Sequence, residues 1–524
     1  MSRFINDPYL AAGAALFACV AIRVGLRSTQ NPNRLPHPPG PKGYPIIGNL
    51  LDAPKLEDEP WRVYDHWRQT YGDLLYFEVL GQPFLILGSL EVVQDLFDRK
   101  SSKYSSRPNL PMIRDLMGWD FDFAFHPYGS LWRKDRRAFH DQFHAGVVQM
   151  YQPMQLKEAH VFLNLLLTEP DGFLHHVRHA FSATIMRIAY GIPIKPHVDS
   201  VYVTAAESAV TTVSLAAIPG TFLVDLIPAL KYVPQWFPGA SFKRKAAQWK
   251  KELNEFIDLP FNHVKELMKS GKAVPSLLTR LLDALPDEKD PSRAEEEDRA
   301  KYVPAAAYAA GADTTVSTVQ TFFLAMAMYP EVARKAQVEL DSVVGHGRLP
   351  DFSDRSSLPY VNAIVKECLR WKLVTNLALA HALSEDDEYN GYFIPKGTIV
   401  MGNAWAILHD PDVFENPEEF IPERYLKDGQ LDPSVRDPAV AAFGFGRRIC
   451  PGRYFAEQNL FILVASTLMA FDIRPPVDEK GNPIQLEAIH IPGLLSYPAP
   501  FKCQITPRSA NISKLIQDSL LDSE

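Results

Sequence analysis

The sequence feature that most constrains this chain is a ten-residue stretch that surrounds one cysteine near the C-terminus. Residues 443–452 read Phe-Gly-Phe-Gly-Arg-Arg-Ile-Cys-Pro-Gly. Glycines let a backbone approach a bulky partner closely, because they lack Cβ and tolerate positive φ. Nearby positive charge and backbone N–H groups favour the thiolate, the form of cysteine that binds metal. An isolated cysteine is more often a small buried hydrophobe, but the residues around Cys450 favour a metal ligand.

This stretch resembles the haem-binding signature of the cytochrome P-450 family, Phe-Gly-x-Gly-x-Arg-x-Cys-x-Gly, at every fixed position. The resemblance implies that Cys450 is the axial thiolate ligand of a haem iron and that Arg448 neutralises a haem propionate. It also implies that Phe443 packs against the sulfur side of the porphyrin and that Gly446 belongs to the haem-binding loop. A dinucleotide-binding site is excluded, because Ile449 stands where a third glycine is required and no strand–helix unit with a downstream acid follows.

A second motif lies in a long apolar segment that is predicted to be helical. Residues 309–315 read Ala-Ala-Gly-Ala-Asp-Thr-Thr, and polar groups inside an apolar helix need partners. A helix turn with its polar side in water is the ordinary alternative. The spacing resembles the family's oxygen-binding motif, in which Gly311 widens the helix, Thr314 hydrogen-bonds dioxygen and Asp313 feeds protons inward. Pro304 is unexpected in this helix, because it lacks an N–H donor.

Two further segments resemble the family's conserved ion-pair elements. Glu367 and Arg370 lie three residues apart on one predicted helix face, and Arg424 lies in the segment Phe-Ile-Pro-Glu-Arg-Tyr. Taken alone, such a pair is common on surface helices. In the family, the Glu-x-x-Arg helix and the downstream arginine form buried ion pairs that lock the core on the haem side, and the resemblance gives these three residues that structural role.

A basic stretch near residue 132 resembles the family's propionate-binding helix. Trp132 and Arg136 are spaced four apart, and the resemblance implies that both reach a haem propionate. It gives His381 the same role. The neighbouring basic residues form either a solvated face or a patch that steers an acidic electron donor. Residues 373–380 lack the prolines and the glycine that are usual in fungal members, so this pocket-lining segment leaves the substrate open.

Composition and the N-terminus limit the class of protein. Of its 524 residues, 46% are hydrophobic and 22% are charged, which is typical of a globular chain. The net charge of −8 argues against a nucleic-acid binder, and four cysteines are too few for a disulfide framework. The apolar run at residues 8–26 is about long enough to span a membrane, and the basic residues after it place the remainder in the cytosol. A signal peptide or an interfacial helix is the alternative.

The motifs follow the family's order from about residue 34 to residue 508. The resemblance therefore implies a mainly helical fold with small β-sheets, in which haem lies between the Thr314 helix and the Cys450 loop. We expect a membrane anchor at 1–29, a proline-rich hinge at 30–48, a haem-thiolate catalytic domain at 49–508 and a polar tail at 509–524. Alternating apolar residues predict a β-hairpin at 74–88, and Asn390-Gly391 predicts a second one.

The same resemblance implies an NADPH- and O2-dependent monooxygenase of fungal specialised metabolism, anchored in the endoplasmic reticulum membrane as a single-pass protein. NADPH–cytochrome reductase would supply electrons, with cytochrome b5 as a further donor, because the chain has no flavin or nicotinamide fingerprint. The substrate is predicted to be lipophilic: a terpenoid is favoured, and an aromatic polyketide or an indole compound is also compatible. Two alternatives stay open, namely a haem-thiolate isomerase or dehydratase that does not use O2, and a non-catalytic haem-binding protein of the same fold.

Overall fold

The structure is a computed structural model that describes residues 31–198, 200–218 and 220–521. The chain forms two compact units. The first comprises Met1–Pro108 and Ala380–Asn403, and the second comprises Asn109–Leu379 and Ala404–Glu524. The predicted membrane anchor at 1–29 lies outside the described residues. Within the described ranges, none of the helices combines the length and the apolar character that a membrane span requires.

The first unit is built on a four-stranded sheet with the order β1-β2-β6-β3. β1 and β2 form an antiparallel hairpin, and β4 and β5 form a second one whose turn residues, Asn390 and Gly391, both have positive φ. That turn conformation matches the twist of the strands it joins, so both predicted hairpins are confirmed. The elements of this unit are η1 (Leu56–Asp58), α2 (Pro60–Tyr71), β1 (Leu74–Val79), β2 (Gln82–Leu87), α3 (Leu90–Val93), η2 (Gln94–Arg99), α4 (Ser101–Tyr104), β3 (His381–Ala382), β4 (Asp387–Tyr389), β5 (Tyr392–Ile394) and β6 (Ile399–Gly402).

Part of the predicted proline-rich hinge is docked onto the sheet of the first unit. The Pro39 carbonyl accepts a hydrogen bond from the Tyr76 N–H at 2.9 Å, and the His37 ring stacks on the Tyr76 ring with centroids 4.7 Å apart. A Cβ at Gly40 would lie 1.7 Å from the Tyr76 carbonyl oxygen. Only glycine permits this approach, so residues 37–40 are a fitted part of the unit.

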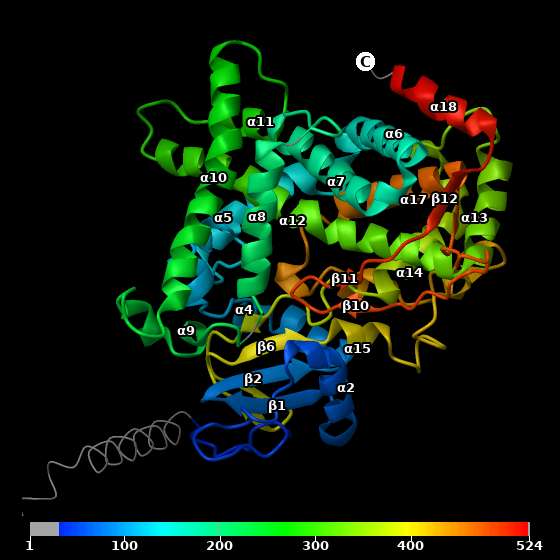
Figure 1. Ribbon diagram of the computed structural model, residues 1–524. Helices are drawn as coiled ribbons and strands as arrows, with labels where there is room; N and C mark the ends of the chain where they lie inside the picture. The colour runs from blue at the N-terminus through cyan, green and yellow to red at the C-terminus, as the bar shows by residue number, and fades with distance from the viewer. Residues whose placement is uncertain (1–30, 199, 219, 522–524) are drawn as a thin grey trace, which may run out of the picture. The chain divides into compact units, whose positions relative to one another are not determined.

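The second unit is mainly helical, which confirms the predicted fold class for the described residues. Its longest helix, α12 (Arg293–Met328), packs against α7 (Phe173–Tyr190) and α17 (Arg453–Ala470) (Figure 1). Residues on all sides of α12 are buried from Val303 to Tyr308 and from Thr315 to Ala327, which explains why these parts of the helix have no polar face. Between them, Ala310 is exposed, and Asp313 and Thr314 are half-buried. Pro304 lies inside this helix without ending it.

The remaining elements of the second unit are shorter. Its other helices are α5 (Ser130–Phe143), α6 (Gln152–Thr168), α8 (Val201–Ala216), α9 (Leu223–Leu226), α10 (Ser241–Lys269), α11 (Leu277–Asp283), α13 (Pro330–Val343), α14 (Pro359–Trp371), α15 (Ala404–Leu408), α16 (Ala439–Ala442) and α18 (Ala510–Leu521). Short turns are η3 (Met112–Leu116), η4 (Trp119–Phe121), η5 (Val148–Tyr151), η6 (Pro170–Gly172), η7 (Pro228–Tyr232), η8 (Phe352–Ser357), η9 (Pro422–Tyr425) and η10 (Gly446–Arg448). Its strand pairs are β7 (Leu426–Lys427) with β8 (Gln430–Leu431), β9 (Phe471–Arg474) with β12 (Gln504–Pro507), and β10 (His490–Ile491) with β11 (Tyr497–Pro498).

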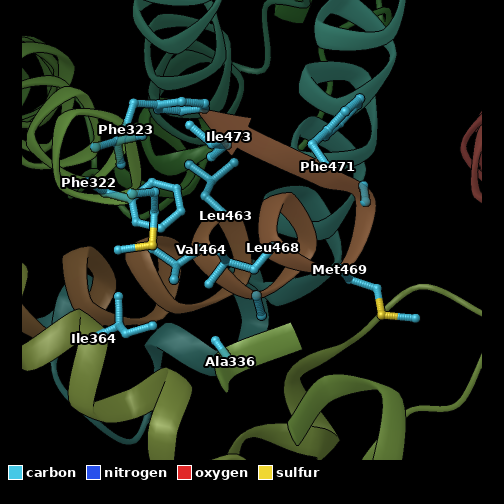
Figure 2. Packing of buried hydrophobic residues seen from close by; sticks show 14 of the residues in the cluster. Phe322, Phe323, Ala336, Ile364, Leu463, Val464, Leu468, Met469, Phe471 and Ile473 are labelled. Atoms are coloured by element: carbon cyan, nitrogen blue, oxygen red, sulfur yellow. The ribbon is translucent and has the colours of Figure 1, made fainter. Parts of the chain in front are cut away.

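A buried apolar cluster joins α12 to α17 in the second unit. Figure 2 shows Phe322 and Phe323 of α12 meeting Leu463 and Val464 of α17, with Ile473 of β9 beside them. Close packing of this kind leaves little freedom for one helix to move against the other. The cluster therefore fixes the helix that follows the cysteine loop against the helix that carries the second motif.

The segment predicted as a polar tail contains α18, which packs on α6. Ile512 and Ile516 of α18 are buried, and Arg508 forms an ion pair with Asp341 at 2.6 Å just before the helix begins. These contacts make residues 508–516 part of the second unit.

Candidate active site

The cysteine loop lies in the second unit between α16 and α17. Gly444 and Gly446 have φ angles of 74° and 57°, a region that glycine enters without steric cost. The Cys450 N–H donates to the Phe443 carbonyl at 2.8 Å and closes the loop. α17 begins at Arg453, so the thiol lies beside the positive end of an 18-residue helix.

Opposing influences act on the Cys450 thiol. Burial raises its pKa, whereas the backbone N–H of Gly452 and the positive charges of Arg136 and Arg453 lower it. The net direction is upward, so these groups compensate a thiolate only in part. A coordinated metal ion deprotonates a thiol outright. The loop is therefore suited to hold a thiolate whose negative charge is balanced by a bound metal cation.

Arg448 joins the loop to the segment that precedes α5. Its guanidinium carbon lies 4.5 Å from the centroid of the Trp132 ring. The guanidinium donates to the Phe123 carbonyl at 3.1 Å and to the His126 carbonyl at 2.6 Å. The side chains of Arg448 and Trp132, which the sequence assigns to one propionate-binding set, are thus in direct contact.

Arg136 of α5 contacts the loop from the other direction. Its guanidinium donates to the Ile449 carbonyl, next to Cys450. Burial lowers the pKa of Arg136 to about 10, although the Cys450 charge acts in the opposite direction. No carboxylate forms an ion pair with Arg136 in the described part of the chain. Arg136 is therefore a cation that the described carboxylates leave without an ion pair.

Unsatisfied donors test whether haem fits these residues. Arg114 Nε and Trp119 Nε1 are buried and have no hydrogen-bond partner among the described residues. The described residues also contain no cluster of three or more His, Cys, Asp or Glu side chains that could hold a metal ion. A metal bound by Cys450 would therefore have to bring other ligands with it. Haem fits on both counts, because the porphyrin supplies those ligands and its propionates supply anions for the cations.

Glu367, Arg370 and Arg424 form one buried network in the second unit. Nε and Nη2 of Arg370 donate to the two Glu367 carboxylate oxygens, both at 2.8 Å, and Arg424 Nε donates to the same carboxylate at 3.2 Å. Glu367 and Arg370 are fully buried. The remaining Arg370 donors reach the backbone carbonyls of Leu408, Pro417 and Glu419. Every charge in this network has partners, as a buried ion pair requires.

Asp313 and Thr314 lie next to each other on α12. Thr314 Oγ1 donates to the Ala310 carbonyl at 2.8 Å, one turn earlier in the helix. Asp313 forms an ion pair with Arg178 of α7. This pair holds the Asp313 side chain toward α7, while the Thr314 hydroxyl is bonded to its own helix.

Two more groups complete the surroundings of Asp313. Tyr497 of β11 donates from its hydroxyl to the Asp313 carbonyl at 3.4 Å, and burial raises the pKa of Tyr497 well above its usual range. Glu207 of α8 lies 4.0 Å from Arg178. A chain of polar groups therefore runs from the half-exposed Glu207 through Arg178 to Asp313.

Comparison with known proteins identifies the family. Residues 38–504 match the family model described as cytochrome P-450. The chain belongs to the cytochrome P-450 family. It is 47% identical over 511 residues to cytochrome P-450 monooxygenase COX2 of Coprinopsis cinerea, covering 97% of this chain and 95% of the relative. It is 40% identical over 484 residues to tryptamine 4-monooxygenase of Psilocybe cyanescens, covering 91% and 94%. The predicted enzyme class, a cytochrome P-450 monooxygenase, is confirmed.

Membership of the cytochrome P-450 family implies a haem-thiolate cofactor, a redox partner and a small-molecule substrate. His381, which the sequence also assigns to this P-450 site, belongs to the first unit. Its Nδ1 lies 2.7 Å from the Tyr104 carbonyl, and its ring lies 4.1 Å from the Phe97 ring. Because the carbonyl only accepts, Nδ1 carries the proton, and Nε2 can donate to a propionate only when the ring is an imidazolium.

Sequence reasoning missed several residues of this P-450 site. Arg178 and Tyr497 reach Asp313 from positions 135 and 184 residues away in the chain, and no local pattern marks such contacts. A weak signal exists for Arg178, because it is a charged residue within the buried helix α7. Arg114 and Trp119 carry no spacing signature either. Each has a buried donor without a partner among the described residues, a feature that they share with residues elsewhere in the chain such as His160.

Proposed function

We propose that this cytochrome P-450 uses O2 and electrons from NADPH, supplied by NADPH–cytochrome reductase with cytochrome b5 as a further donor, to oxidise a lipophilic compound of fungal specialised metabolism. The observation that carries the proposal is the Cys450 loop, in which a backbone turned at two glycines places one thiol near Arg136. Arg136 is a half-buried cation that has no ion-paired carboxylate among the described residues. When bound, haem supplies the oxygen-activating chemistry.

In this proposal the protein's own residues hold the prosthetic group by charge and shape. Cys450 would ligate the iron, while Arg448, Arg136 and Trp132 would hold the propionates. The contact between Arg448 and Trp132 supports this, because it fixes the guanidinium before any anion arrives. His381 is proposed as a further propionate partner. We propose that the Phe443 ring packs against the porphyrin and that Gly446 forms the turn of the haem-binding loop. The Phe443 carbonyl accepts the hydrogen bond that closes this loop.

Asp313 and Thr314 are proposed to manage protons. Thr314 Oγ1 has one donor and is bonded to its own helix, so it can exchange that bond for one to a reacting oxygen. Asp313 bridges toward α7 through Arg178, which links it to the more exposed Glu207. A carboxylate between a polar chain and a hydroxyl is suited to passing protons into a pocket that otherwise excludes water.

The proposed substrate is lipophilic, with a terpenoid favoured and an indole or aromatic polyketide compatible. By resemblance to the family, we assign residues 109–125 to the cap of the haem pocket. This segment is mostly apolar, and its residues Met112, Ile113 and Met117 are fully buried in the second unit. The tryptamine 4-monooxygenase relative acts on an indole compound by its name, which keeps indoles among the candidates. The segment at 373–380, which departs from the usual family sequence, does not narrow the choice of substrate further.

We further propose that the enzyme lies on the endoplasmic reticulum membrane. In the segment between α9 and α10, Tyr232 and Trp236 are 78% and 79% exposed. Tyrosine and tryptophan are enriched at membrane–water interfaces, and Lys243 and Arg244 follow in the next turn of chain. This segment is a candidate second contact besides the N-terminal anchor.

The thiolate assignment is tested by Cys450→Ala. The variant should lose the shifted absorption band of the reduced carbon-monoxide complex, because alanine cannot ligate iron. Cys503→Ala, which removes a buried thiol elsewhere in the second unit, should keep the band. A band that persists in Cys450→Ala would contradict thiolate ligation by this residue.

The reaction is tested with membranes that contain the wild-type protein and a reductase. Terpenoid, indole and polyketide candidates should give products that are about 16 Da heavier, only when both NADPH and O2 are present. Product that forms without NADPH would instead support the isomerase or dehydratase alternative. Bound haem without turnover of any candidate would support the non-catalytic one.

A further inference from the structure

A surface cavity of about 490 Å³ lies in the second unit, away from the cysteine loop. Its walls come from η8, the first turn of α14 and strand β8. The charged residue of this cavity, Arg355, lies over the ring of Phe461 in α17. Phe461 comes eight residues after Arg453, the first residue of α17, so the two residues are about 12 Å apart along the helix axis. The cavity is within the volume range of small-molecule sites.

Arg355 is the one charged side chain among the residues that line this cavity. Its Nε donates to Asn362 Oδ1 at 3.1 Å, and Asn362 Nδ2 donates back to the Arg355 carbonyl at 2.7 Å. The guanidinium carbon lies 5.3 Å from the centroid of the Phe461 ring, within the range of a cation–π contact. The guanidinium is therefore held from two directions before any ligand is present.

The two Nη atoms of Arg355 have no hydrogen-bond or ion-pair partner in the part of the chain that the structure describes. The neighbouring carboxylate of Asp354 is occupied by Arg348 at 2.5 Å. Burial lowers the pKa of Arg355, and Glu457 offsets this by its charge alone, from beyond ion-pair distance. The outer edge of the guanidinium thus faces the cavity, and none of the described carboxylates lies within ion-pair distance of it.

Three apolar side chains line the cavity beside Arg355, together with Ser356, Asn362 and Gln430. Phe352 and Pro359 line one part of it, and Leu431, which is 37% exposed, lines another. Leu431 is on the β7–β8 hairpin, whose turn residues Asp428 and Gly429 have φ angles of 51° and 74°. This two-residue turn matches the twist of the strands, so the wall does not need a ligand to form.

We propose that this cavity binds a small amphipathic anion, with a carboxylate or phosphate head on the Nη atoms of Arg355 and a short apolar body against Phe352, Pro359 and Leu431. The guanidinium edge matches the geometry of two oxygens of either head group. The site is separate from the haem chemistry, and its ligand reaches it from solvent.

The test uses full-length, haem-loaded protein and 4-phenylbutyrate as the probe, with binding measured by titration calorimetry. Wild type should bind 4-phenylbutyrate and should bind its neutral analogue, 4-phenylbutanol, at least tenfold more weakly. Phenyl phosphate tests the other head group. The haem absorption spectrum should not change on binding, which separates this site from the haem pocket. Equal binding of acid and alcohol, or no binding of either anion, would overturn the proposal.

Variants locate the site. Arg355→Leu should weaken 4-phenylbutyrate binding at least tenfold, whereas Arg334→Leu, which removes an exposed arginine of α13, should leave it unchanged. Leu431→Asp and Leu431→Lys change only an exposed hairpin residue, so both should fold. The aspartate should abolish binding by repulsion and the lysine should retain it. Unchanged binding in Arg355→Leu, or equal effects of the two Leu431 variants, would overturn the assignment.

Discussion

Three arginines of the second unit, Arg136, Arg370 and Arg424, are wholly or partly buried beside backbone carbonyls, but their counter-charges differ. Arg370 and Arg424 share the carboxylate of Glu367, and the leftover Arg370 donors are taken up by three carbonyls. Arg136, beside the cysteine loop, donates to the Ile449 carbonyl and forms no ion pair with a carboxylate of the described ranges. Burial lowers its pKa to about 10, whereas the Glu367 carboxylate lies directly against Arg370.

This difference separates a structural site from a binding site. Taking charges out of water is unfavourable unless an opposite charge and full hydrogen bonding accompany them. The Glu367 network meets that condition within the protein, so its contribution does not depend on a ligand. The cysteine loop does not meet it, and the buried donors of Arg114 and Trp119 are unsatisfied as well. An anionic group such as haem would complete the second site, and folding alone completes the first.

Glu367→Gln should give the largest loss of stability. It leaves Arg370 buried without a counter-ion, which typically costs about 3–5 kcal/mol. We expect little haem-loaded protein and a lower midpoint of thermal unfolding for the protein without haem. Glu331→Gln, an exposed change on α13, serves as the control. Normal haem content and normal unfolding in Glu367→Gln would remove the distinction between the two sites.

Arg178→Leu should have an intermediate effect. Its ion pair with Asp313 is partly exposed, with side-chain exposures of 33% and 13%, and such pairs contribute roughly 1 kcal/mol or less. Stability and haem content should therefore change little, while the amount of product formed per NADPH consumed should fall several-fold. Arg178→Lys should restore part of that coupling. Full coupling in Arg178→Leu would exclude Arg178 from the proton path.

Arg136→Leu should have the smallest effect on the stability of the protein without haem. Any change in that stability should be an increase, in contrast to the effect of Glu367→Gln. Replacing an uncompensated buried cation by an apolar side chain is neutral or stabilising. The same change should accelerate transfer of haem to an apoglobin acceptor, because a propionate partner is lost. Arg137→Leu, on the exposed side of α5, should change neither quantity. Slower or unchanged haem transfer would contradict the role of Arg136.

The local features of this fold were predictable because they depend on residues close together in the chain. Asn390-Gly391 specifies its hairpin, since both residues adopt positive φ there. Gly444 and Gly446 adopt the positive φ that the cysteine loop requires. The Glu367–Arg370 pair has one helix turn of spacing, and its bidentate contact follows from that spacing.

The long-range features were not predictable in the same way. The proline-rich segment was expected to be a hinge, but its fit to β1 rests on Gly40 meeting Tyr76, 36 residues further along the chain. α18 was expected to be a polar tail, and its two buried isoleucines show their role only against α6. The sequence periodicity of neither segment indicates which residues of another element pack against it.

The sequence by itself determined the family and the enzyme class, and it singled out the thiol that we propose as the haem ligand, because glycine conformations and motif spacings are local properties. Only the tertiary structure decided which charges have partners. It brought Arg178 to Asp313 and Glu367 to Arg424. Within the described ranges, it left Arg136 and the outer edge of Arg355 without an ion-paired carboxylate. Whether a charge has a counter-ion depends on the distance between the two groups in space, and the free energy of a buried charge depends on that distance.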